Sequence, residues 1–197
     1  MSDMLKVGFK LLIITVVAAL GLSLTNLATA DAIEEQKIKI ANEARQAVLS
    51  GAENFKPIEV DAGYSGEGTS AYIDEIYAGK LDDSLVGYTF RVLAKGYGGD
   101  IEIIVGIDAE GKIEAVQIGG HSETPGLGAK IADDSFTSQY SDKAVDEALE
   151  VVKGKASGDS QIEAISGATV STQAVTEGVN KAIEYYNKVL NTGGEAQ

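Results

Sequence analysis

The sequence Ser166-Gly167-Ala168-Thr169 stands directly before a long stretch with helical periodicity, and it determines how the C-terminal part of the chain folds. From Thr172 to Leu190, apolar residues recur at three- and four-residue intervals, which predicts an amphipathic helix. Small residues in front of a helix predict a tight turn, in which Gly167 lets the backbone approach a ligand closely. We expect a brief strand over Ile162–Ile165 to lead into this turn.

The start of this helix is a suitable place for an anion. The first backbone N–H groups of a helix have no acceptor within it, and the helix dipole is positive at that end. Thr169 would present its hydroxyl beside these groups, and Ser171 or Thr172 is expected to cap the helix. Similar turn-and-cap sequences also occur where nothing binds, so the motif alone leaves a purely structural role open.

A second Gly-rich segment, Glu123-Thr124-Pro125-Gly126-Leu127-Gly128, lies about forty residues upstream. Taken alone, it is typical of a Pro-Gly turn with a glycine in the left-handed conformation. His121 is the single histidine of the chain, and we expect it to be a partly buried structural residue rather than a proton relay. Tyr97, in the turn Gly96-Tyr97-Gly98-Gly99, is interpreted as a core tyrosine at a strand end, with stacking on a ring as the alternative.

Glycine-containing turns separate β-rich runs between Gly51 and Ile118, and this pattern predicts an antiparallel sheet. Asp142–Val152 fits a short helix that runs into a strand, and the sequence leaves this assignment open. The predicted fold class is therefore α+β, an antiparallel sheet with packed helices, preceded by a single N-terminal transmembrane helix. The expected strands are Ile58–Asp61, Ala71–Tyr77, Leu85–Ala94, Ile101–Ile107 and Ile113–Ile118.

Composition removes several classes of function. The chain of 197 residues has no cysteine, which excludes disulfides, Cys-ligated zinc and iron–sulfur clusters. Redox chemistry would therefore need an organic cofactor. The formal net charge of −14 disfavours nucleic acid as a partner. It also makes a free phosphorylated cofactor hard to retain, because Lys130, Lys153 and Lys155 are the few basic residues near the two motifs.

The N-terminal segment is long and apolar enough to span a membrane. Leu11–Ala28 carries no charge and would span about 27 Å as a helix. Lysines precede it and acidic residues follow it, which predicts a cytoplasmic N-terminus and an exported remainder. Ala28-Thr29-Ala30 resembles a signal-peptide cleavage site, so a cleaved leader is the alternative to an anchor. A helix over residues 31–50 is expected to continue outward as a stalk.

The two motifs, in this order, resemble the FMN-binding domain shared by the G subunit of Rnf complexes and the C subunit of the Na⁺-translocating NADH:quinone oxidoreductase. The resemblance covers nearly the whole chain, and its length fits the Rnf branch better. It implies that Thr169 carries FMN through a phosphoester, attached after export by a flavin transferase that uses FAD. This family usually has Asp where the present chain has Glu163.

The resemblance also implies roles for the second motif. Glu123 and Thr124 would hydrogen-bond polar edges of the flavin or its ribityl chain, Leu127 would pack on the ring, and Gly128 would allow close approach. No catalytic residue and no metal ligand are expected. The expected FMN-binding residues are Thr169, Ser166, Gly167, Ala168, Val170, Glu123, Thr124, Leu127, Gly128 and Lys130.

The predicted organisation is a short cytoplasmic segment (1–10), a transmembrane helix (11–30), a stalk helix (31–50) and an extracytoplasmic FMN-binding domain (51–197). By resemblance, the chain is an electron relay in a cell-membrane complex that exchanges electrons between ferredoxin and NAD⁺ and translocates Na⁺ or H⁺. Its partners would be the other membrane subunits. Two alternatives stay open at this point: the related component of the quinone reductase, and an exported anion-binding module without a redox role.

Overall fold

The computed structural model describes residues 2–65 and 70–191, in two compact units, Met1–Asn42 and Glu43–Gln197. Helix α1, Ser2–Val48, is continuous. Its stretch Leu5–Ala30 is 26 residues long and apolar enough to cross a membrane, properties that signal sequences share. The expected boundary between a membrane helix and a stalk helix therefore lies within one helix. The last residues of the predicted domain, 192–197, lie outside the described residues.

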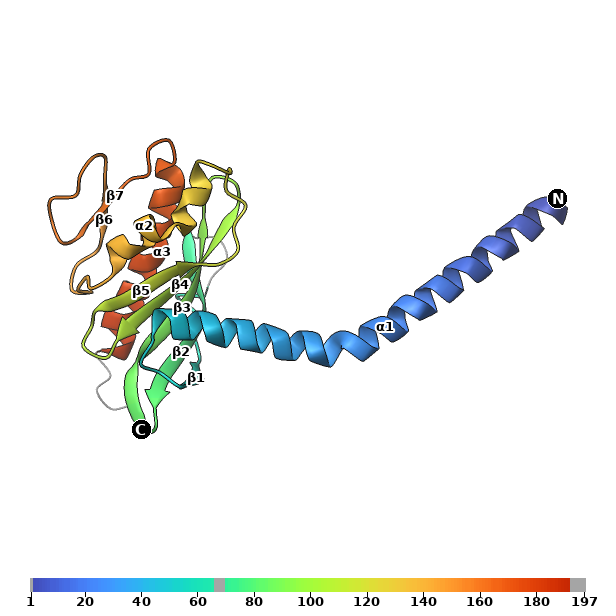
Figure 1. Cartoon of the computed structure of the whole chain (residues 1–197), viewed down its shortest axis with the longest axis horizontal. Coiled ribbons are helices and arrows are strands. Elements are labelled where there is room, and N and C mark those ends of the chain that lie inside the picture. The colour runs from blue at the N-terminus through green and yellow to red at the C-terminus, as the bar shows by residue number, and fades with distance from the viewer. Residues whose placement is uncertain (1, 66–69, 192–197) are drawn as a thin grey trace. The chain divides into compact units, whose positions relative to one another are not determined.

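The second unit is built on an antiparallel sheet, which has five strands in sequence order within the described residues (Figure 1). This finding confirms the predicted α+β class. Strands that follow one another along the chain are also neighbours in the sheet. Their connections are short, except for the one between β1 and β2. The strands are β1 Asn54–Ile58, β2 Ala71–Leu81, β3 Ser84–Lys95, β4 Asp100–Asp108 and β5 Ile113–Ile118.

The sequence predicts the later strands better than the first. The predicted β5 has the observed bounds, whereas the strand predicted at Ile58–Asp61 overlaps β1 only at Ile58. Pro57 lies inside β1. Proline has no backbone N–H to donate to a neighbouring strand, so its presence argues against a central position in a sheet. The sheet tolerates it because β1 is an edge strand and pairs only with β2.

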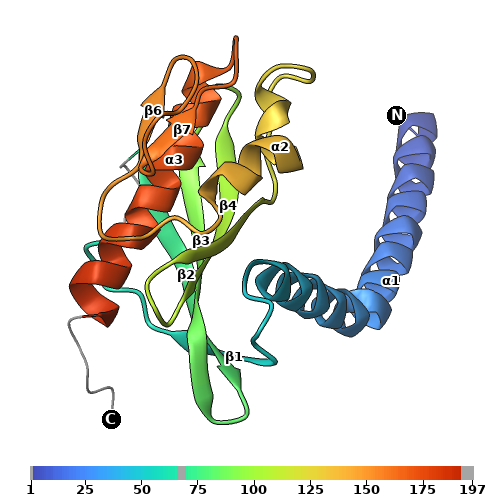
Figure 2. The same ribbon diagram turned by 60° about the vertical axis from the view of Figure 1, so that its left-hand side comes forward.

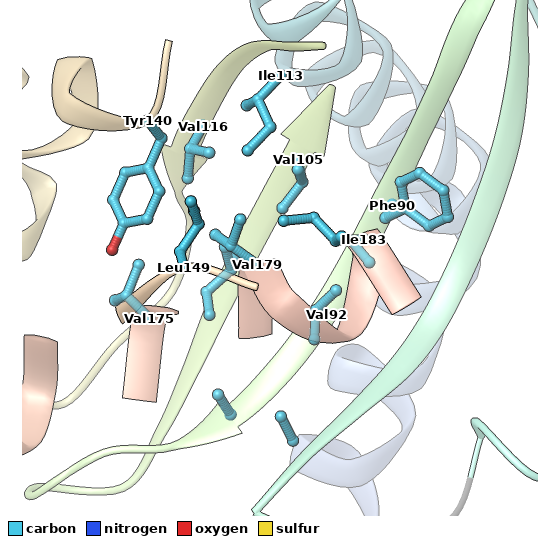
Figure 3. Packing of buried hydrophobic residues seen from close by; sticks show 14 of the residues in the cluster. Phe90, Val92, Val105, Ile113, Val116, Tyr140, Leu149, Val175, Val179 and Ile183 are labelled. Carbon is cyan, nitrogen blue, oxygen red and sulfur yellow. The ribbon is translucent and has the colours of Figure 1, made fainter. Parts of the chain in front are cut away.

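Helix α3, Thr169–Tyr185, lies along one face of the sheet and continues as the π-helical segment η3, Tyr186–Leu190 (Figure 2). Its apolar side packs on residues that alternate along the strands, as a sheet with one buried face requires. Val92 and Val105 from the sheet and Val179 and Ile183 from α3 belong to one cluster of buried side chains (Figure 3).

The opposite face of the sheet receives the C-terminal end of α1. Val48 and Leu49 are 1% and 0% exposed, respectively. Arg45 forms an ion pair with Glu75 of β2 at 2.9 Å, and its guanidinium lies 3.6 Å from the centre of the Tyr77 ring. This end of α1 is therefore fixed to the sheet by both packing and charge.

Between β5 and α3 the chain forms three short helices and a small parallel pair of strands. The helices are η1 Gly128–Ala132, α2 Asp134–Thr137 and η2 Ser138–Tyr140, none of which the sequence predicted. Over Asp142–Val152, where the sequence left open a short helix running into a strand, only Glu150–Val152 is a regular element, the strand β6. It pairs with β7, Gln161–Glu163, which leads toward α3. In Figure 2, α2 and the N-terminal end of α3 lie at the same end of the sheet.

Candidate functional site

The small-residue motif ends in the first turn of α3. The helix begins at Thr169, three residues before the predicted Thr172, with Ala168 as N-cap and no side-chain cap bond. The predicted capping by Ser171 or Thr172 is therefore wrong. Both hydroxyls lie one turn too far along the helix, and each has another partner.

The backbone of the motif forms a tight turn. Gly167 adopts φ +79°, a left-handed conformation that favours glycine. The Ala168 amide donates to the Ile165 carbonyl at 2.9 Å and closes the turn. Strand β6 holds the residue that follows β7, since the Ala164 amide donates to the Val152 carbonyl at 2.9 Å. The turn thus delivers Thr169 to the start of α3 from a fixed strand.

Three backbone amides at this helix start have no hydrogen-bond acceptor among the described residues, those of Thr169, Val170 and Ser171. This arrangement follows from helix geometry, because the first amides have no carbonyl four residues earlier within the helix. Together with the positive end of the helix dipole, they form a site that favours a negatively charged group.

The hydroxyl groups of this region differ in what they bind. Thr172 Oγ1 accepts a hydrogen bond from the Ile165 amide and donates to the Ala168 carbonyl, both at 3.1 Å. Ser171 Oγ donates to Glu123 Oε2 at 2.5 Å. The half-buried Thr169 forms no side-chain hydrogen bond within the described part of the chain, although it lines a cavity. Its hydroxyl is therefore available for chemistry.

This cavity has a volume of about 530 Å³. It opens where the β3–β4 turn, the loop after β5 and the start of α3 meet. Small-molecule pockets typically measure about 300–1,000 Å³, so a ligand of cofactor size fits. The lining residues are Tyr97, Glu123, Thr124, Leu127, Gly128, Gly167, Ala168, Thr169, Val170 and Ser171.

Eight of the ten residues expected at the site line this cavity, from both Gly-rich motifs. The two exceptions are Ser166, which is exposed in the turn, and Lys130, which is exposed on η1. The structure thus brings the two sequence motifs together at one cavity. Lys130 does not line the cavity because η1 starts at Gly128 and carries the chain away from it.

Two lining residues were assigned other roles from sequence. The side chain of Tyr97 is 76% exposed at the cavity, so its interpretation as a core residue is wrong. It lies in a glycine-flanked turn between strands, and a lone aromatic in such a turn is the signal that indicates an exposed position. Ser171 was interpreted as a cap and instead faces Glu123. His121 is partly buried, as predicted, and its Nδ1 accepts from the Glu123 amide at 3.3 Å.

The cavity has an apolar rim and an acidic wall. Leu127 and Val170 are 48% and 50% exposed on its border, whereas Glu123 is 5% exposed. None of the lining residues found in the described part of the chain is Lys, Arg or His. An unattached phosphate in this cavity would therefore meet amides and a helix dipole but no cationic side chain.

These features suit FMN. Free amides and an unpaired hydroxyl at a helix start match a phosphoryl group, and exposed Tyr97, Leu127 and Val170 match the faces of an aromatic ring system. In agreement with this geometry, the family described as the FMN-binding domain matches residues 96–184. The match contains both Gly-rich motifs and the whole of the cavity lining.

Comparison with curated proteins places the chain more narrowly. It is 39% identical over 191 residues to the G subunit of the Na(+)-translocating ferredoxin:NAD(+) oxidoreductase complex of Acetobacterium woodii, covering 93% of this chain and 92% of the relative. It is 34% identical over 167 residues to the proton-translocating counterpart of Clostridium ljungdahlii, covering 85% and 82%. The chain therefore belongs to the family of G subunits of ion-translocating ferredoxin:NAD(+) oxidoreductase complexes.

Solved structures confirm the fold. The C subunit of the Na(+)-translocating NADH-quinone reductase from Parabacteroides distasonis matches with a TM-score of 0.51 and 23% identity, over 58% of this chain and 61% of that one. Shewanella oneidensis NqrC matches with a TM-score of 0.50 and 24% identity, over 71% and 67%. At this level of identity the likeness concerns the α+β architecture alone.

Proposed function

We propose that this chain is an electron-relay component of a membrane-bound ferredoxin:NAD⁺ oxidoreductase complex and carries FMN as a phosphoester of Thr169. Bound FMN supplies one- and two-electron redox chemistry. The chain itself would hold the flavin, tune it through neighbouring groups and leave part of the ring accessible to its redox partners. This role requires no substrate-turnover site within the chain.

The observation that carries the proposal is the state of the Thr169 hydroxyl. Thr169 lines the cavity, and its hydroxyl has no hydrogen-bond partner among the described residues, next to three amides that lack acceptors there. The neighbouring hydroxyls of Ser171 and Thr172 are engaged in protein hydrogen bonds, and Ser166 does not line the cavity. Of the motif hydroxyls, Thr169 is thus best suited as acceptor.

The charge of the cavity also supports covalent attachment. A phosphate monoester carries close to two negative charges at neutral pH, and the described cavity wall offers Glu123 but no cationic side chain. Esterification lowers the phosphate charge by one and prevents the cofactor from diffusing away. In the proposed maturation step, Thr169 Oγ bonds to the phosphorus of the FMN half of FAD. The bond to the adenylate breaks, AMP leaves, and the transferase takes the hydroxyl proton.

Membrane attachment and sidedness complete the proposal. Leu5–Ala30 is apolar enough to span a bilayer, Lys6 and Lys10 lie at its N-terminal end, and acidic residues follow it. By the positive-inside rule this asymmetry favours an extracytoplasmic FMN domain. Partners would be the other membrane subunits of the complex, and electron transfer would be coupled to translocation of Na⁺ or H⁺, as the names of the relatives describe for them.

Co-expression with a flavin transferase tests the proposal. Flavin fluorescence on a denaturing gel is expected for the natural chain and for Thr124→Val, which changes another hydroxyl that lines the cavity. It is expected to be absent for Thr169→Val, because the valine has no oxygen to esterify. Fluorescence retained by Thr169→Val would reject Thr169 as the attachment site. A natural chain without flavin absorption bands would reject the flavin itself and favour a binding module without redox function.

A further inference from the structure

Three chain segments that are distant in sequence build the cavity. Tyr97 comes from the β3–β4 turn, Glu123 and Leu127 come from the loop after β5, and Thr169 and Ser171 come from the first turn of α3. Each segment contributes its own wall. Because the segments are loops or ends of helices and strands, the cavity has a fixed shape only if contacts between the segments hold their relative positions.

The carboxylate of Glu123 contacts both of the other segments. Its Oε1 accepts a hydrogen bond from the Gly98 amide at 2.9 Å, and its Oε2 accepts one from Ser171 Oγ at 2.5 Å. These partners lie 25 and 48 residues away in sequence, respectively. Hydrogen bonds to a carboxylate are stronger than those between neutral groups, so this one side chain links the three walls.

The surrounding glycines leave the carboxylate little freedom. A Cβ atom at Gly96 would lie 2.3 Å from Glu123 Oε1, and one at Gly128 would lie 2.4 Å from Oε2. At Gly98 an added Cβ would lie 2.1 Å from the Ser122 carbonyl oxygen. The backbone therefore closes around Glu123, which is 5% exposed. A side chain confined in this way can hold its hydrogen-bond partners in fixed positions.

We infer that Glu123 is a positioning residue, which assembles the flavin cavity by joining the β3–β4 turn and the first turn of α3 to its own loop. Each carboxylate oxygen accepts one protein hydrogen bond, and in this role Glu123 acts on the flavin through Gly98 and Ser171. Ser171 follows Thr169 by two residues, and its bond to Glu123 fixes the helix turn that carries the flavin acceptor. This inference rests on the proposed function for its flavin, but not for the link between the segments.

Hydrogen exchange on the full-length chain made without the transferase tests the link by itself. In Glu123→Ala, exchange in segments 96–99, 121–128 and 169–172 should rise together by roughly tenfold or more, because both bonds are lost. Glu123→Gln should stay within about threefold of the natural chain, because its amide oxygen can accept from Gly98 and its NH₂ can donate to Ser171. A rise confined to 121–128 would overturn the inference.

Thr176→Val is the matched control. It removes two buried hydrogen bonds from the same helix, 2.8 Å to Tyr140 and 3.0 Å to the Thr172 carbonyl, neither of which involves a residue that lines the cavity. It should leave exchange in segments 96–99 and 121–128 unchanged. If Glu123→Ala does not fold, Ser171→Ala provides the second variant. Raised exchange in 169–172, with 96–99 unchanged, would support the link, and unchanged exchange in 169–172 would contradict it.

In flavin-loaded protein, the midpoint potential and the fluorescence anisotropy of the flavin are two properties that simple destabilisation does not change. Glu123→Ala should shift the flavin midpoint potential and lower the fluorescence anisotropy of the flavin, whereas Glu123→Gln should restore the anisotropy and Thr176→Val should leave both unchanged. Natural potential and anisotropy in folded Glu123→Ala would contradict the positioning role. A natural chain without flavin would refute the proposed function alone, since the exchange experiment still decides the link.

Discussion

Ile165 and Thr172 are joined across the motif turn, because the Ile165 amide donates to Thr172 Oγ1 at 3.1 Å. The same hydroxyl donates to the Ala168 carbonyl at 3.1 Å, and Thr172 is fully buried. Thr172 therefore supports the turn from inside, whereas Thr169 faces the cavity. Thr172 thus has a structural role, and the chemical role is the one proposed for Thr169.

Thr172→Val should destabilise the protein without moving the flavin. Valine has the same shape but leaves the Ile165 amide without its acceptor, at a cost of about 1–3 kcal/mol in the free energy of unfolding. Urea unfolding measures this loss, and gel fluorescence should still locate flavin on the folded protein. If Thr172→Val lost the flavin and Thr169→Val retained it, the roles would be reversed: Thr172 would carry the flavin and Thr169 would support the turn.

Free FMN should bind poorly to the chain that lacks the acceptor hydroxyl. In Thr169→Val the cofactor would depend on a cavity without a described cationic side chain, so gel filtration should separate the two. Val170→Lys in that background places an ammonium group on the cavity border and should tighten binding roughly fivefold, about 1 kcal/mol. Tight binding of free FMN by Thr169→Val would show that the ester is not what retains the cofactor.

Gly106→Ala should loosen the contact between the end of α1 and the sheet. An added Cβ would lie 1.9 Å from the Val48 carbonyl oxygen, a backbone atom that cannot move aside as a flexible side chain can. Overpacking of this kind costs about 1–3 kcal/mol, or more where backbone must move. Gly63→Ala is the control, because nothing lies within 4 Å of its added Cβ. Equal unfolding midpoints for the two variants would contradict this packing.

Tyr140 should make the protein less stable at high pH. Burial raises the pKa of Tyr140 above its usual range, although its hydrogen bond to Thr176 lowers it slightly. Above pH of about 10 the unfolded chain loses the phenolic proton while the folded chain keeps it, so the free energy of unfolding falls by up to about 1.4 kcal/mol per pH unit. Tyr140→Phe should reduce that slope in urea unfolding between neutral and alkaline pH, and an unchanged slope would assign it to other groups.

The absence of cysteine allows a direct test of sidedness. Gly63→Cys places a single thiol on the FMN domain, and Ser2→Cys places one before the membrane-spanning stretch. In intact cells a membrane-impermeant maleimide should label Gly63→Cys but not Ser2→Cys, in keeping with the charge asymmetry around residues 5–30. The reverse pattern would put the domain on the cytoplasmic side.

The sequence predicts the parts of the fold that depend on local periodicity. Strand β5 was predicted with its observed bounds, and the long C-terminal helix begins three residues earlier than predicted and becomes π-helical after Tyr185. The helices η1, α2 and η2 are too short to show a period, and Phe136 and Tyr140 are buried through tertiary contacts. Short segments of this kind are determined by what they pack against.

The two motifs contain most of the residues that line the cavity, but they do not predict the contacts between these residues. Most expected residues line the cavity because each motif is a compact turn. The roles of Ser171 and Tyr97 depend on residues far away in sequence, since Ser171 meets Glu123 only once α3 has packed on the sheet. Hydrogen bonds across such distances leave no pattern in a single sequence.

The most direct measurement is a peptide map of the protein isolated from its native membrane. The peptide containing Ser166-Gly167-Ala168-Thr169 should carry the mass of FMN less one water, with fragmentation placing it on Thr169. An unmodified Thr169 in that protein, or flavin on another residue, would contradict the attachment of FMN at Thr169.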